Sequence, residues 1–111
     1  MATLKEKPTL ADLQEYIKVL SAERGWDKNN HLEMFLLFTE EVGELAKGIR
    51  AYSNLYQEES KKKSKEETKK ELEGEFADVL SYLLDLANYF EVDLEKAFRE
   101  KEAINAKREW N

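Results

Sequence analysis

Apolar residues recur along the chain at the three- and four-residue spacing that is typical of amphipathic helices. The first run predicts a helix over residues 9–23, whose apolar positions are Leu10, Leu13, Ile17 and Leu20. Thr9 is its expected N-cap, since Asp12 follows three residues later as in a capping box. Gly25 is the expected end of this helix.

Three further runs predict three more helices. The second covers residues 31–52, with an apolar arc of Phe35, Phe38, Val42, Leu45, Ala46 and Ile49. The third covers residues 66–90, with an apolar face of Leu72, Phe76, Val79, Leu80, Leu83, Leu86 and Phe90. The fourth covers residues 94–108 after an N-cap at Asp93, with a buried face of Leu94, Ala97, Phe98 and Ile104. The expected fold is an all-α, four-helix bundle that forms a single domain over residues 1–111.

The segments between these helices differ in character. Residues 1–8 are expected to be a loose N-terminus, and residues 25–30 a polar loop. Residues 53–70 form a charged, apolar-poor connection with a basic cluster at 61–65. A solvated linker is the expected role of that cluster, and contact with phosphates is the alternative. Within the second helix, Gly43 and Gly48 would let a backbone or a ligand approach closely.

The composition suits a small helical protein that gains core by association. The chain has 111 residues, of which 41% are hydrophobic and 38% charged, with one Pro and four Gly. Because a chain this short buries a modest core, apolar faces on all four helices favour a homodimer or homotetramer. Cys is absent, which excludes disulfides and thiolate metal sites, and a single His argues against a nitrogen-rich zinc site.

The charge balance narrows the possible partners. A formal net charge of −6 argues against non-specific binding to nucleic acid, which needs a basic surface. A small nucleotide stays possible, because a bound metal inverts the local charge. No apolar run approaches the length of about 20 residues that a membrane span needs. The N-terminus carries no apolar stretch of the signal-peptide kind. A cytoplasmic protein is expected.

Two pairs of acidic residues carry the candidate chemistry. Glu41 and Glu44 lie three apart on the shoulder of the second helix's apolar arc, and Glu75 and Asp78 lie three apart on the third helix. If the two helices pack antiparallel, four carboxylates meet, and their repulsion is relieved by a hard divalent cation with oxygen ligands. On this basis we hypothesise a magnesium enzyme that acts on nucleotide phosphates. Solvated acidic faces are the alternative that spacing alone leaves open.

Other residues could contact a substrate. Trp26, in the polar loop, could stack on a base or could cap the core beside the first helix. Lys101, Asn105 and Arg108 fall on the apolar face of the fourth helix, where charged groups need partners. Carboxylates or substrate phosphate could supply them, or the two cations could extend outward along the helix.

These motifs resemble those of the MazG-like nucleoside triphosphate pyrophosphohydrolases, of the all-α NTP pyrophosphatase superfamily. The pattern E-E-x-x-E reads Glu40-Glu41-x-x-Glu44, and E-x-x-D reads Glu75-x-x-Asp78, within EEVGELAKGIR and GEFADVLSYLLDLAN. The tail KEAINAKREW is similar to the family's K-x-x-x-N-x-x-R. The segment RGWDKNNHLEMFLLFTEEVGEL resembles the approach to the metal helix in dCTP-pyrophosphatase-like members. The resemblance covers roughly residues 10–110.

The resemblance implies hydrolysis of a (deoxy)nucleoside triphosphate to the monophosphate and pyrophosphate. Glu41, Glu44, Glu75 and Asp78 would hold Mg²⁺, with Mn²⁺ as a possible substitute. Glu40 and Glu41 become the catalytic candidates, with Glu40 orienting water or assisting a second metal. The implied substrate contacts are Lys101 and Arg108 on the phosphates, Asn105 on phosphate or sugar, and Trp26 and Tyr82 on the base. Small members of this family form dimers or tetramers.

Three other hypotheses compete with a MazG-like pyrophosphohydrolase. A non-catalytic helical dimerisation or regulatory module would show no metal dependence. A di-iron bundle usually has Glu-x-x-His pairs, and the single His here has no Glu three residues before it. Within the superfamily, a dUTP- or dCTP-specific enzyme and a phosphoribosyl-ATP pyrophosphohydrolase are the nearest rivals.

Overall fold

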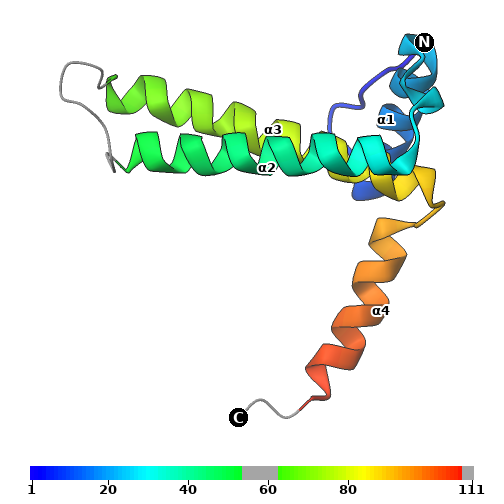
Figure 1. The fold of residues 1–111 in the computed structure, drawn as a ribbon. Helices are drawn as coiled ribbons and strands as arrows, with labels where there is room; N and C mark the ends of the chain where they lie inside the picture. The colour runs from blue at the N-terminus through cyan, green and yellow to red at the C-terminus, as the bar shows by residue number, and fades with distance from the viewer. Residues whose placement is uncertain (54–62, 109–111) are drawn as a thin grey trace. The chain divides into compact units, whose positions relative to one another are not determined.

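The computed structural model of the chain describes residues 1–53 and 63–108, and this part is all-helical (Figure 1). Its elements are α1 (Leu10–Arg24), a short 3-10 helix η1 (Trp26–Lys28), α2 (His31–Tyr52), α3 (Lys65–Tyr89) and α4 (Leu94–Ala106). No strand occurs in the described residues, so the all-α prediction is confirmed. The observed helices begin and end within two residues of the expected positions.

Local signals in the sequence account for the ends of the helices. The Thr9 hydroxyl accepts a hydrogen bond from the Asp12 N–H, and the Asp12 carboxylate accepts one from the Thr9 N–H, which completes the predicted capping box. Gly25 ends α1 in the left-handed conformation with φ +73°. Asn30 and Asp93 cap α2 and α4 through their side-chain oxygens. Because these caps act over a few residues, the sequence alone located those at Thr9, Gly25 and Asp93, whereas the cap at Asn30 was not predicted.

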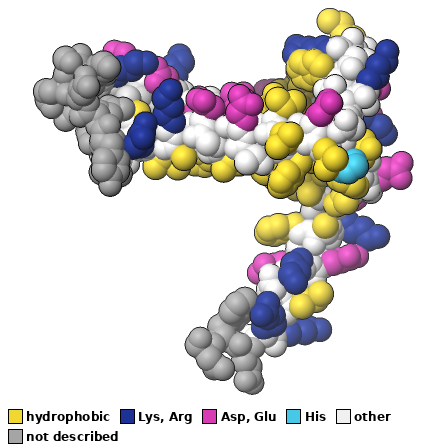
Figure 2. Space-filling view, viewed as in Figure 1, with side chains coloured by type: hydrophobic (Ala, Val, Ile, Leu, Met, Phe, Trp, Pro, Cys, Tyr) yellow, Lys and Arg dark blue, Asp and Glu magenta, His cyan; other side chains and the backbone are white. Residues whose placement is uncertain are grey.

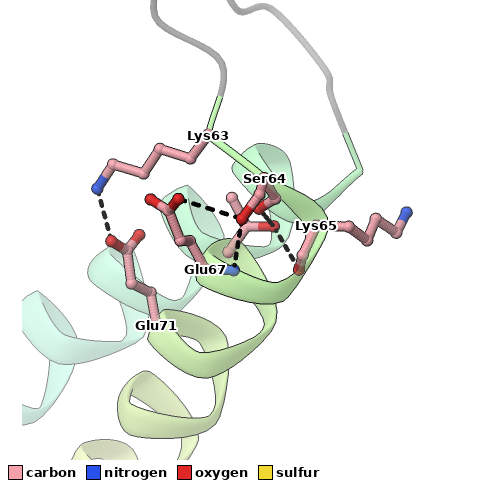
Figure 3. A network of polar contacts seen from close by, with 6 residues as sticks. Lys63, Ser64, Lys65, Glu67 and Glu71 are labelled. Carbon is pink, nitrogen blue, oxygen red and sulfur yellow. Dashed lines mark hydrogen bonds and ion pairs between the residues drawn. The ribbon is translucent and has the colours of Figure 1, made fainter.

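The start of α3 lies inside the predicted charged connection. Ser64 accepts a hydrogen bond from the Glu67 N–H, while Lys63 forms an ion pair with Glu71 one turn further along (Figure 3). The helix therefore begins at Lys65, and residues 65–70 are helical. Lys61 and Lys62, from the predicted basic cluster, lie outside the described residues. The Lys65 ammonium lies 4.3 Å from the centre of the Tyr52 ring at the end of α2.

The chain divides into two compact units. One is the helix-pair unit, Asn30–Leu83, and the other is the terminal unit, Met1–Asn29 with Leu84–Asn111. In the helix-pair unit, α2 and α3 run side by side in opposite directions (Figure 1). Apolar side chains follow one edge of this pair, and acidic side chains lie along the opposite edge (Figure 2).

Much of the predicted core of the helix-pair unit is exposed. Among the described residues of this unit, Met34 is the buried apolar one. The large side chains of the predicted apolar faces are exposed in the single chain: Phe35, Val42, Ile49, Phe76, Leu80 and Leu83. Two helices packed side by side bury only the stripe between them, so the other apolar positions need another surface to cover them.

The terminal unit has a small core. Leu84 and Ala87 of α3 are buried, together with the polar Gln14 and Ser21 of α1. The predicted buried face of α4 is wrong for the single chain, because α4 has no buried residue and Phe98 is 68% exposed. The described part of the chain has no helix long and apolar enough to cross a membrane.

Candidate metal centre

Three carboxylates from two helices converge in the helix-pair unit. Glu41 comes from α2, and Glu75 and Asp78 come from α3. One carboxylate oxygen of each lies within 4.8 Å of the other two. Glu41 and Glu75 are half-buried, and Asp78 is exposed. The group thus combines three oxygen ligands with an open side, the arrangement that a hard divalent cation with remaining water ligands prefers.

Gly48 helps α2 and α3 approach each other beside this group. A Cβ atom placed on Gly48 would lie 3.4 Å from Glu75 Cγ and 3.5 Å from Leu72 Cδ1. The stem of Glu75 therefore lies against the α2 backbone at the position where α2 has no side chain. The close approach expected at Gly48 is confirmed. A Cβ atom placed on Gly43, by contrast, would have no neighbouring atom within 4 Å.

The group is electrostatically unfavourable by itself. The pKa of the Glu41 carboxyl is raised above its ordinary value, first by burial and then by the charges of Asp78 and Glu75. The charges of Glu40 and Glu44 add smaller effects in the same direction. A cation bound between the carboxylates would reverse this repulsion, so the chemistry of the donor set fits a divalent metal ion.

The other two acidic residues of the α2 motif lie outside the group. Glu44, almost one turn beyond Glu41, is exposed, and so is Glu40. Neither belongs to the three carboxylates within 4.8 Å of one another. The structure thus brings together three of the four predicted metal ligands, and the metal-binding role of Glu44 stays a prediction.

The aromatic candidates occupy different elements. Trp26 lies in η1 and is 44% exposed. The Arg24 guanidinium lies 4.9 Å from the centre of its ring and covers one face by a cation–π contact. Tyr82 is half-buried on α3, four residues after Asp78 and hence one turn along the same face.

The phosphate-binding candidates belong to the terminal unit. Lys101 is exposed on α4, and Asn105, one turn further along, is half-buried. Arg108 lies beyond the end of α4, because the helix ends at Ala106 rather than at the predicted residue 108.

The sequence interpretation missed a set of polar residues in the terminal unit. The Ser21 hydroxyl donates to the Asp85 carboxylate at 2.9 Å, and the Gln14 side chain is hydrogen-bonded to Asn88 and to the turn before α4. Burial raises the pKa of Asp85, while the hydrogen bond from Ser21 opposes that shift. The available signal was that Gln14 and Ser21 share the apolar stripe of Leu10 and Ile17, where a polar residue needs a partner.

The chain is similar to known proteins over most of its length. Residues 29–108 match the MazG nucleotide pyrophosphohydrolase domain, a range that contains all three converging carboxylates. The chain is also 35% identical over 96 residues to the uncharacterized protein YvdC of Bacillus subtilis. That match covers 83% of this chain and 91% of YvdC.

Proposed function

This chain belongs to the MazG nucleotide pyrophosphohydrolase family, and we propose that it hydrolyses nucleoside or deoxynucleoside triphosphates to the monophosphate and pyrophosphate with Mg²⁺. The observation that carries the proposal is the convergence of Glu41, Glu75 and Asp78 within 4.8 Å. In the reaction, a water oxygen bonds to the α-phosphorus, the bridge to the β-phosphate breaks, and pyrophosphate leaves.

The three carboxylates would hold the metal ion, and Glu44 would join them when its side chain turns toward α3. A bound Mg²⁺ would supply Lewis-acid stabilisation of the charge on the phosphate oxygens. Glu41 is favoured as the central ligand, because its carboxyl lies close to both Glu75 and Asp78, and burial and then their charges raise its pKa. Glu40 is exposed beside it and is proposed to accept a hydrogen bond from the attacking water.

Substrate binding is assigned to cationic, amide and aromatic groups. Lys101 and Arg108 would pair with phosphate oxygens, and Asn105 would donate to phosphate or sugar. Tyr82, one turn from Asp78, and Trp26, with nearly half of its surface exposed, would contact the base. The motifs do not favour one base, so the preferred nucleotide is left to experiment.

We also propose that two or more copies of the chain associate through the helix-pair unit. Phe35, Val42 and Ile49 are exposed at seven-residue intervals on α2, the spacing of a helix-packing seam. Phe76, Leu80 and Leu83 form a second exposed stripe on α3. Contiguous apolar surface of this kind marks an interaction site, and a second copy would cover it.

A substrate panel tests the proposal directly. The purified chain is incubated with each NTP and dNTP in Mg²⁺ and again in excess EDTA, and pyrophosphate and orthophosphate are assayed separately. We expect metal-dependent release of pyrophosphate, with one or a few bases preferred. Release of orthophosphate would contradict the assigned bond cleavage, and absence of turnover on every nucleotide would favour a helical interaction module.

Matched variants separate a site effect from a charge effect. Asp78→Asn removes one carboxylate charge from the group, and Glu73→Gln removes one from an exposed position on the same helix. We expect Asp78→Asn to lower kcat/KM by at least about a hundredfold, since loss of even an outer-shell partner of a metal costs about 10–100-fold. We expect Glu73→Gln to change it by less than about threefold.

A further inference from the structure

Gln14 of α1 forms hydrogen bonds with the end of α3, with the turn that follows it and with the first residue of α4. Its side chain is only 8% exposed. Its Nε2 donates to the Val92 carbonyl at 2.8 Å and to Asn88 Oδ1 at 3.2 Å. Its Oε1 accepts from the Leu94 N–H at 2.8 Å, and Asn88 Nδ2 donates back to the Gln14 carbonyl at 2.9 Å. This set of four hydrogen bonds is called the Gln14 clasp below.

The Gln14 clasp joins the end of α3 to the beginning of α4. Leu94 is the first residue of α4, where a backbone N–H has no acceptor within its own helix. Asp93 satisfies the Lys96 N–H, while Gln14, from α1, satisfies the Leu94 N–H. The start of α4 is therefore anchored to a different helix.

The turn itself is strained. Glu91 has φ +55°, a left-handed conformation that is unfavourable for a residue with a Cβ. The Val92 N–H donates to the Ala87 carbonyl at 2.8 Å and the Glu91 N–H to the Asn88 carbonyl at 3.1 Å, the pattern of a Schellman motif. Such a conformation persists when the surroundings over-determine it, and the Gln14 clasp supplies contacts on both sides of Glu91.

Packing within the described part of the terminal unit leaves α4 largely exposed. The helix has no buried residue, and both Phe98 and Ile104 are more than half exposed. At 1.5 Å per residue, Lys101 lies about 10 Å and Asn105 about 16 Å along the axis from Leu94. A tilt of about 10° at Leu94 would thus displace Asn105 by roughly 3 Å, about the length of a hydrogen bond, so a contact from Asn105 to the substrate would be broken.

We propose that Gln14 is a positioning residue, which aims α4 through hydrogen bonds on both sides of the α3–α4 turn and so sets the affinity for the substrate's phosphates. The inference rests on the proposed function, in which Lys101 and Asn105 on α4 bind the substrate. Gln14 itself touches no reacting atom. Its loss therefore weakens substrate binding more than it slows the chemical step.

The position of α4 can be measured without any assay of activity. Because the chain contains no Cys, single cysteines at Ala22 and Glu102, both exposed, accept spin labels selectively. Pulsed electron-spin resonance, on labelled chain diluted with unlabelled chain, then gives the distance distribution between α1 and α4. We expect one narrow distribution for Gln14 and a distribution at least about twice as wide for Gln14→Ala.

Two further variants guard against simple misfolding. Gln14→Glu keeps the size of the side chain and the acceptor for Leu94, but it places an oxygen against the Val92 carbonyl, so it should widen the distribution as well. Glu15→Gln alters the adjacent exposed residue and should leave the distribution unchanged. Circular dichroism with thermal unfolding confirms that each variant is folded under the conditions used.

Steady-state kinetics complete the test. For Gln14→Glu we expect KM for the preferred triphosphate to rise about tenfold, kcat to change less than about threefold, and affinity for Mn²⁺ to stay as in the parent chain. An unchanged distance distribution in both Gln14 variants would overturn the inference, as would a widened distribution with unchanged KM. Failure of the parent chain to hydrolyse any nucleotide would instead refute the proposed function.

Discussion

Two stretches of α3 carry polar side chains with opposite surroundings. In one stretch the side chains lie beside groups of like charge, and in the other they are paired by hydrogen bonds. At Glu75 and Asp78, carboxylate oxygens face a third carboxylate from α2, and burial and repulsion raise the pKa of Glu41. At Asn88, donors face acceptors, and the Gln14 clasp pairs both side-chain amides. Repelling groups held close together cost stability unless a ligand relieves the repulsion, whereas paired amides need no ligand. The contrast distinguishes a candidate metal centre from a structural joint on one helix.

The largest expected effect on the free energy of unfolding is at Leu84 of α3, and the adjacent Leu83 is its control. Leu84 is 2% exposed in the terminal unit, and Leu83 is 41% exposed in the helix-pair unit. Leu84→Ala should lower the free energy of unfolding by about 3 kcal/mol, because it leaves a cavity in a small core. Leu83→Ala should cost less than about 1 kcal/mol when measured on the dilute chain.

Urea denaturation at several protein concentrations checks this pair. If copies associate through the helix-pair unit, the Leu83→Ala defect should grow as protein concentration rises, while the Leu84→Ala defect should not. Equal losses for both variants at every concentration would contradict the division into a buried and an interface-forming face.

A smaller effect is expected at the glycine beside the carboxylates. Gly48→Ala should raise the free energy of unfolding by up to about 1 kcal/mol, because Ala favours a helix and its Cβ would make ordinary contacts. Gly48→Leu should instead displace Glu75 and weaken binding of a divalent ion. Gly43→Leu is the control, since the space around Gly43 is open within 4 Å. Isothermal titration with Mn²⁺ would show equal affinities for the two Leu variants if Gly48 has no positioning effect.

The repulsion at Glu41 predicts the direction in which stability changes with pH. Because the pKa of Glu41 is higher in the folded chain than in the unfolded one, its carboxyl contributes stability at low pH that is lost as pH rises through the raised value. In EDTA at neutral pH, Glu41→Gln should therefore raise Tm, by up to about 4 °C. Mg²⁺ should raise the Tm of the parent chain and not that of Glu41→Gln. A lower Tm for Glu41→Gln in EDTA would be inconsistent with mutual repulsion.

The smallest expected effect on stability comes from Asp12 in the terminal unit. Its contribution to stability is lost as pH falls, whereas that of Glu41 is lost as pH rises. The Thr9 N–H and then the Lys5 ammonium lower the pKa of Asp12 from 3.8 to about 2. Asp12 therefore stabilises the folded chain above pH 3.8, and this contribution disappears as pH falls through about 2. Asp12→Asn should lower Tm slightly at pH 7, with the difference shrinking toward pH 2. A constant Tm difference across this range would show that the capping charge contributes nothing.

Much of the fold follows from local sequence signals, and less of its packing does. Thr9, Gly25 and Asp93 act within one turn of their helices, so the predicted helix ends agree with the structure. An apolar stripe such as that of Phe35 and Val42 reveals an amphipathic helix, but not whether the same chain or another copy covers it.

The candidate metal centre also depends on helix packing, which local sequence signals do not determine. Helical spacing placed Glu75 beside Asp78, because both lie on one helix. The depth and rotation at which α2 packs against α3 are not encoded in the spacing along either helix. The structure brings Glu41 rather than Glu44 to Glu75 and Asp78, and Leu72 and Glu75 approach α2 at Gly48. The Gln14 clasp joins residues more than 70 positions apart in the sequence, which no local pattern encodes.

The most direct test of the central claim is a titration of the chain with Mn²⁺, followed by the electron-spin resonance signal of the free ion. Mn²⁺ accepts the same oxygen ligands as Mg²⁺ and is detected selectively. We expect saturable binding to the parent chain and to Glu73→Gln, and its loss in Glu75→Gln and Asp78→Asn. Equal Mn²⁺ affinity in all four proteins would contradict the assignment of Glu41, Glu75 and Asp78 as a metal centre.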